Sequence, residues 1–100
     1  MTSTGASSRD PREELIECRN AIEVVDRRLV ALLAQRVALG RRAAQAKRAA
    51  GLPMVDPTRE VEVIRAALGA AAESELPAEP VREIFERIIE LSRRVQESAR

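Results

Sequence analysis

Residues 32–47 read LLAQRVALGRRAAQAK, and the arginine at position 36 decides how the rest of the chain is interpreted. Around it, apolar residues recur at alternating spacings of three and four, which is typical of a coiled-coil seam and predicts one long helix. The series is Leu15, Cys18, Ile22, Val25, Leu29, Leu32, Leu39, Ala43, Ala46 and Ala50. Arg36 occupies an interior position of this seam. Burying an unpaired charge costs roughly several kcal/mol, so solvent, a protein carboxylate or an anionic ligand must meet Arg36.

The long helix has both a start signal and a stop signal. Asp10 and Pro11 suit an N-cap and a first helical residue, and Gly51 suits the residue after a helix. The first helix is therefore expected over about residues 11–50. Residues 1–10 are dominated by Ser, Thr and Gly and are predicted to form a disordered tail.

Two shorter helices are expected after it. Asp56 and Pro57 repeat the start signal, and an apolar stripe predicts a helix over about residues 57–73. The segment SELPAEP (74–80) interrupts the helix, and a second stripe predicts a helix over about residues 78–98, with Pro80 in its first turn. The domain over residues 11–100 is thus predicted to be all-α, with one long, one short and one medium helix.

The first helix is too long for its own chain to cover. Forty residues of helix span about 60 Å, whereas a compact domain of 100 residues has a radius of gyration of about 13 Å. The seam must therefore meet a second chain, and a symmetric homodimer is the commonest solution. We expect an intertwined homodimer.

Composition narrows the classes of function. The net charge is +1 and Phe85 is the only aromatic residue, which argues against a nucleic-acid surface. The chain has no histidine, and its single cysteine, Cys18, excludes an intrachain disulfide and a cysteine-based zinc site, so we expect no metal. The N-terminal residues do not resemble a signal peptide, and no stretch is apolar enough to span a membrane. A cytoplasmic location is expected.

Polar side chains fall on the apolar stripes of all three helices. Arg36 and Lys47 are eleven residues apart, which places them on nearly the same face, about 16 Å apart along the axis. Glu60 faces inward from the first turn of the second helix, four residues before an apolar position. Ser92 and Gln96 occupy the stripe of the third helix. Each has a simpler explanation, as a solvated edge residue, a first-turn acid or a boundary position.

Taken together, these residues predict a pocket for an anionic ligand that carries hydroxyl groups. The set has cations, a carboxylate, an amide and a hydroxyl, but no activated nucleophile. If the pocket is catalytic, the reaction should need orientation and charge stabilisation. Arg19 lies about 25 Å along the helix from Arg36, so it could approach only the Arg36 of another chain in an antiparallel dimer.

Three runs of the sequence together resemble the all-helical class of chorismate mutases. They are RNAIEVVDRRLVALLAQRVALGRRAAQAK (19–47), PMVDPTRE (53–60) and IFERIIELSRRVQ (84–96), and the likeness extends over about residues 12–98. The resemblance implies an intertwined dimer of three-helix chains with two equivalent sites. It also implies a one-step Claisen rearrangement of chorismate to prephenate without a cofactor, for phenylalanine and tyrosine biosynthesis. The chain looks like a stand-alone, monofunctional mutase.

The resemblance also implies roles in binding the substrate. Arg36 binds one carboxylate of chorismate, and Arg19 reaches in from the other subunit to bind the second carboxylate. Ser92 assists at a carboxylate. Lys47 and Gln96 donate hydrogen bonds to the ether oxygen, where negative charge grows as the C–O bond breaks.

The remaining implied contacts come from the start of the second helix. Glu60 accepts a hydrogen bond from the ring hydroxyl, and the loop at Asp56 supports that contact. Arg59 matches a position that lines the site. By the resemblance, the catalytic residues are Arg36, Lys47, Gln96 and Glu60.

Two other functions remain open at this point. The same fold could act on a related substrate, as an isochorismate pyruvate lyase or as a mutase for an amino-substituted chorismate, although the acidic pair Asp56 and Glu60 favours chorismate itself. Alternatively, the chain could be a helical module of low activity that docks on another shikimate-pathway enzyme.

Overall fold

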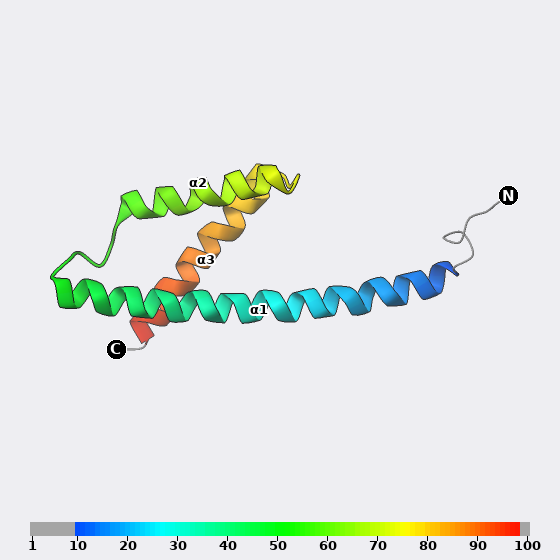
Figure 1. Ribbon diagram of the computed structural model, residues 1–100, viewed down its shortest axis with the longest axis horizontal. Coiled ribbons are helices and arrows are strands. Elements are labelled where there is room, and N and C mark those ends of the chain that lie inside the picture. Colours follow the sequence, from blue (N-terminus) through cyan, green and yellow to red (C-terminus); the bar gives the residue numbers. More distant parts are fainter. Residues whose placement is uncertain (1–9, 99–100) are drawn as a thin grey trace. The chain divides into compact units, whose positions relative to one another are not determined.

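A computed structural model describes residues 10–98, which form three α-helices and no strand (Figure 1). Helix α1 spans Pro11–Ala50, α2 spans Pro57–Glu73 and α3 spans Ala78–Ser98. The all-α class predicted from the sequence is confirmed. The disordered tail predicted for residues 1–10 falls almost wholly outside the described residues.

Capping residues set the starts of α1 and α2. Asp10 Oδ1 accepts a hydrogen bond from the backbone N–H of Arg12 at 3.0 Å. Asp56 Oδ1 accepts one from the backbone N–H of Arg59 at 3.1 Å. Both aspartates pair N–H groups that have no partner inside the helix, as predicted from the sequence.

A Schellman turn ends α1. Gly51 has a φ of 70°, which a residue with a side chain rarely adopts. The backbone N–H of Leu52 donates to the carbonyl of Lys47 at 2.8 Å, and that of Gly51 donates to the carbonyl of Arg48 at 3.2 Å. The turn directs the chain into the loop that precedes Asp56.

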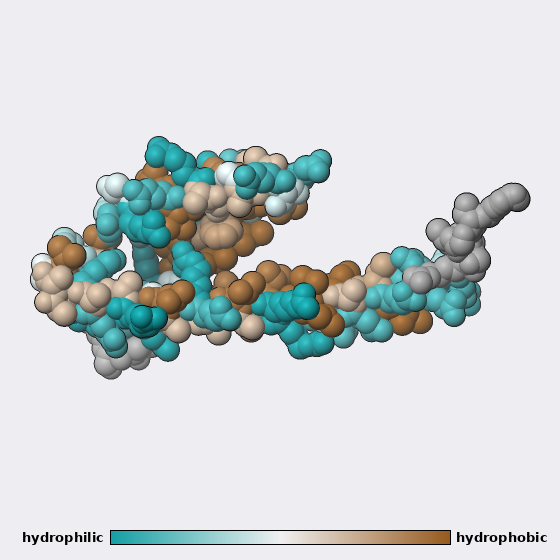
Figure 2. Space-filling view, viewed as in Figure 1, coloured by the Kyte–Doolittle hydropathy of each residue, from teal (hydrophilic) through white to brown (hydrophobic). Residues whose placement is uncertain are grey.

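The described residues divide into two compact units, residues 10–33 and residues 34–98. From residue 10 onward, the first unit consists of the first part of α1. Its large apolar seam residues are 48 to 57% exposed; they are Leu15, Ile22, Val25, Leu29 and Leu32. Figure 2 shows apolar side chains, in brown, at the surface along α1. The first unit therefore leaves the seam uncovered.

The second unit contains the rest of α1 together with α2 and α3. Helices α2 and α3 pack against each other. Small side chains form the buried core of the described residues: Ala44 of α1 and Ala67 and Ala71 of α2. No large side chain between residues 10 and 98 is fully buried. The core of the single chain is therefore small.

The covered face of α1 in this unit is offset by one residue from the predicted seam. Ala44 is buried, and Val37 and Gly40 are half-buried, whereas the seam residues Leu39 and Ala43 are exposed. The chain thus covers the neighbouring face of α1 and leaves the seam open here as well. No helix of the described residues is long and apolar enough to cross a membrane.

Candidate functional site

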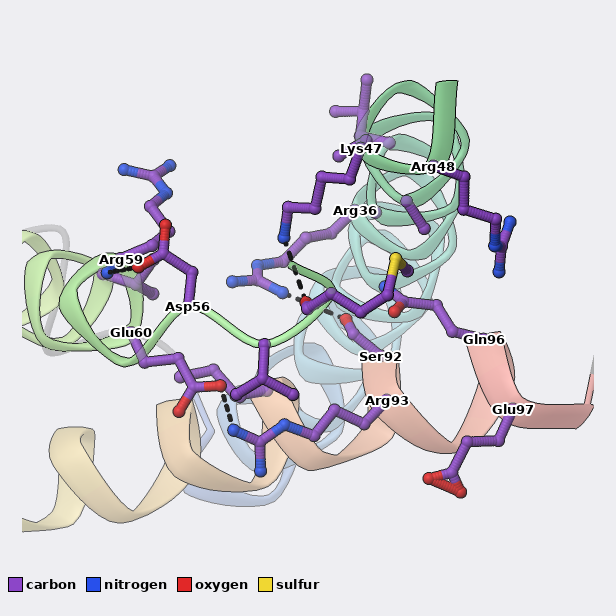
Figure 3. Close-up of a pocket in the computed structure, with 18 residues that line it drawn as sticks. Arg36, Lys47, Arg48, Asp56, Arg59, Glu60, Ser92, Arg93, Gln96 and Glu97 are labelled. Atoms are coloured by element: carbon purple, nitrogen blue, oxygen red, sulfur yellow. Dashed lines mark hydrogen bonds and ion pairs between the residues drawn. The ribbon is translucent and has the colours of Figure 1, made fainter. Parts of the chain in front are cut away.

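The second unit contains a cavity of about 610 Å³, lined by residues of α1, α2, α3 and the loop between α1 and α2 (Figure 3). This volume lies in the range of sites for small molecules. Five cationic and three acidic side chains line it: Arg36, Lys47, Arg48, Arg59, Arg93, Asp56, Glu60 and Glu97. The five against three give the lining a net charge of +2, which suits a ligand with two negative charges.

Arg36 projects from α1 toward α3. Its Nη1 donates a hydrogen bond to Ser92 Oγ at 3.1 Å. Ser92 is only 8% exposed. Its hydrogen bond with Arg36 explains why a buried hydroxyl occupies the apolar stripe of α3. Guanidinium has five N–H donors, and this bond uses one of them. The arrangement holds the side chain in place while most of its donors remain for an anionic group.

Lys47 is half-buried near the end of α1 and reaches the loop. Its Nζ donates to the carbonyl oxygen of Met54 at 3.4 Å. The ammonium has three donors, so this single bond leaves two for a ligand. Figure 3 shows Lys47 and Arg36 projecting to the same side of α1.

Gln96 of α3 lies against a glycine of α1. A Cβ built on Gly40 would lie 3.1 Å from Gln96 Nε2, closer than most side-chain contacts allow. Glycine in a helix interior costs about 0.5–1 kcal/mol relative to alanine. The close approach gives that cost a structural reason, because the missing side chain makes room for the amide.

The acidic residues of the cavity come from the start of α2. Asp56 uses Oδ1 as the N-cap of α2. Glu60, one turn later, has a side chain that is 35% exposed, and its Oε2 accepts from Nη2 of Arg93 on α3 (Figure 3). This ion pair joins α2 to α3 at the edge of the cavity.

The cavity brings together most of the residues selected from the sequence. Seven of them line it: Arg36, Lys47, Asp56, Arg59, Glu60, Ser92 and Gln96. Arg19 does not, because it belongs to the first unit, where it is exposed on α1. Its contact across a dimer stays a prediction.

Three charged residues of the lining were not selected from the sequence. Arg48, Arg93 and Glu97 occupy exposed helical positions, where a charge is the ordinary choice. For Arg93 only its proximity to Glu60, 33 positions earlier, distinguishes it from a surface arginine. Among residues 10–98, no group of three or more His, Cys, Asp or Glu side chains is placed to hold a metal ion.

Comparison with known proteins identifies one family. The family model of chorismate mutase type II matches residues 18–97, which are 80 of the chain's 100 residues. The matched region includes the cavity and Arg19. No curated protein matches the chain.

Proposed function

The chain belongs to the type II chorismate mutase family, and from this premise we propose that it is an isomerase that rearranges chorismate to prephenate in the biosynthesis of phenylalanine and tyrosine. The observation that carries the proposal is the convergence of Arg36, Lys47, Glu60 and Gln96 on one cavity. The net positive lining suits a substrate with two carboxylates.

Orientation is the first contribution of the site. Arg36, held by Ser92, binds one carboxylate of chorismate through paired N–H groups, and Ser92 assists at that carboxylate. The second carboxylate meets Arg19 of the partner subunit. Two such clamps hold the substrate in the chair-like conformer in which the breaking and forming bonds are aligned, so less entropy is lost on reaching the transition state.

Charge stabilisation is the second contribution. The ether oxygen becomes more negative as its C–O bond breaks, so donors aimed at it bind the transition state more tightly than the substrate. Lys47 and Gln96 are these donors. The hydrogen bond of Lys47 to the loop holds the ammonium toward the cavity, and the absence of a Cβ at Gly40 leaves room for the Gln96 amide. Glu60 accepts from the ring hydroxyl, and Asp56 supports it through the start of α2.

We also propose that the active form is a homodimer. The seam residues of α1 are about half exposed in the single chain, and an amphipathic helix is stabilised mainly by burying such a face. An antiparallel partner would cover the seam and bring Arg19 to the cavity. This arrangement makes each site depend on both chains.

The test is an assay with chorismate. We expect loss of its diene absorbance with prephenate as product, and a loss of at least about 10³ in kcat/KM in Arg36→Ala, since one well-placed electrostatic contact contributes about 10²–10³ and Arg36 also orients the substrate. Arg41→Ala is the matched control, because Arg41 is exposed on α1 and does not line the cavity. Release of pyruvate from isochorismate, or no turnover by a folded dimer, would contradict the proposal.

A further inference from the structure

The ion pair between Glu60 and Arg93 differs in kind from other ion pairs of the described residues. Arg59–Glu62, Arg82–Glu79, Arg87–Glu90 and Arg94–Glu90 each join positions three or four apart on one helix. Arg93 and Glu60 are 33 positions apart and connect α3 to α2. Exposed pairs within a helix contribute little. A pair between helices at a cavity fixes where a carboxylate lies.

The two oxygens of the Glu60 carboxylate differ in their contacts. Arg93 Nη2 binds Oε2, on the side of the carboxylate that faces α3. That bond leaves Oε1 able to accept from another donor, and Glu60 lines the cavity. Because the Arg93 side chain is about half exposed and that of Glu60 about one third exposed, the pair lies at the rim of the cavity.

Charge is the second consequence of the pair. Without Arg93, Glu60 would present a full negative charge to the ring substituent of the substrate and would favour a cation there. With Arg93 bound, the pair is neutral overall and still offers one accepting oxygen. A hydroxyl needs only the acceptor, whereas a protonated amine also gains from negative charge and is repelled by a guanidinium beside it.

From this geometry we propose that Arg93 is a positioning and specificity residue, which orients Glu60 and makes the site select a ring hydroxyl over a ring amine. The proposal rests on the proposed function, since it concerns the substrate contact of Glu60. The competing substrate class is an amino-substituted chorismate in which an amine replaces the ring hydroxyl.

The experiment compares two substrates across a set of variants. The ratio of kcat/KM for chorismate to that for the amino-substituted chorismate is measured for the unsubstituted protein, Arg93→Gln and Arg93→Lys. We expect Arg93→Gln to lower the ratio at least about tenfold, the order expected from removing one nearby, partly screened charge. Arg93→Lys keeps the positive charge but loses the planar set of N–H donors of the guanidinium. It should keep the ratio within about threefold of the original, because the proposal assigns selectivity to the charge.

Arg94→Gln is the matched control. It removes the same charge one position along α3, where the side chain is 75% exposed and pairs with Glu90 on its own helix. We expect no change in the ratio. Because a merely structural role would lower both rates together, an unchanged ratio in Arg93→Gln would overturn the inference, as would an equal change in Arg94→Gln.

The proposed function and this inference fail in different ways. If the unsubstituted protein does not convert chorismate, the proposed function is wrong and the inference is wrong with it. If the unsubstituted protein converts chorismate and Arg93→Gln keeps the original ratio, only the inference is wrong. Circular dichroism of each variant establishes that the compared proteins are equally helical.

Discussion

The two units of the chain place their side chains in opposite ways. In residues 10–33, large apolar side chains such as Ile22 and Leu29 are more than half exposed. In residues 34–98, Ser92 is buried, and charged side chains such as Arg36 and Lys47 are half-buried. Each arrangement is unfavourable for a chain alone, since apolar surface is left in water and polar groups are withdrawn from it.

The difference indicates what each unit is built to meet. An apolar seam is stabilised by the seam of another helix, whereas half-buried donors are stabilised by an acceptor that enters the cavity. The first unit is therefore suited to a protein partner and the second to a polar ligand. Three predictions test that division, beginning with the largest expected effect.

A charge on the seam should separate the proposed dimer. Leu29→Asp places a carboxylate within the first unit's apolar seam, twice in a symmetric dimer. Burying an unpaired charge costs several kcal/mol, so we expect the dissociation constant to rise by at least about a hundredfold. Turnover of chorismate should fall with it, because Arg19 of the partner subunit is lost from each site. Sedimentation at several protein concentrations measures the change.

The control places the same carboxylate elsewhere on the first unit. Arg27 lies two positions before Leu29, on nearly the opposite side of α1 by the rotation of 100° per residue. We expect Arg27→Asp to remain dimeric and active. A dimer that survives Leu29→Asp as well as Arg27→Asp would mean that the seam is not the interface.

The second prediction concerns the glycines of the second unit. Gly40→Ala brings a Cβ to within 3.1 Å of Gln96 Nε2, whereas a Cβ on Gly69 of α2 meets nothing within 4 Å. Both changes favour helix by up to about 1 kcal/mol. We expect Gly69→Ala to raise the melting temperature and leave the rate unchanged. Gly40→Ala should lower kcat by about three- to tenfold, since a displaced donor stabilises the ether oxygen less well.

Measurements of kcat and melting temperature on the two alanine variants together separate activity from stability. If Gly40→Ala and Gly69→Ala behave alike, the close approach of Gly40 to Gln96 has no part in catalysis. If kcat falls in Gly40→Ala but not in Gly69→Ala, the glycine at position 40 serves catalysis although it weakens the helix.

The sequence predicts those features that depend on neighbouring residues. The aspartates that cap α1 and α2 and the glycine that ends α1 act through hydrogen bonds that span at most five positions, so their patterns suffice. Helical periodicity likewise predicts that Arg36 and Lys47 share a face, and both line the cavity. Ser92 and Gln96 were selected because they interrupt an apolar stripe.

Features that depend on how helices pack were not predicted. The pairing of Arg93 with Glu60 depends on the distance between α2 and α3. The small, buried side chains of Ala67 and Ala71 permit close packing but do not specify that distance. The offset of the covered face of α1 from its seam has the same origin, since periodicity gives a face but not the element that covers it. Arg19 remains a prediction because its proposed contact belongs to a second chain.

The smallest expected effect concerns the turn that joins α2 to α3 and so supports the pairing of Glu60 with Arg93. Glu75 has a φ of 58°, and the backbone N–H of Leu76 donates to the carbonyl of Ala71 at 2.8 Å. The turn has the same hydrogen-bond pattern as the turn that ends α1, but Glu75 takes the left-handed position that Gly51 occupies there. Glu75→Gly should stabilise the protein by about 0.5–1 kcal/mol, because relief of the left-handed strain exceeds the added entropy of the unfolded chain.

Gly51→Ala is the reciprocal change and should destabilise the protein by about 1 kcal/mol, because alanine meets the strain that glycine avoids. Urea unfolding at one protein concentration measures both, with an unchanged slope showing that only stability has changed. Opposite shifts of the two midpoints would establish that the turns at the ends of α1 and α2 have the same geometry. A lower midpoint for Glu75→Gly would instead mean that the Glu75 side chain stabilises its turn by more than the strain costs.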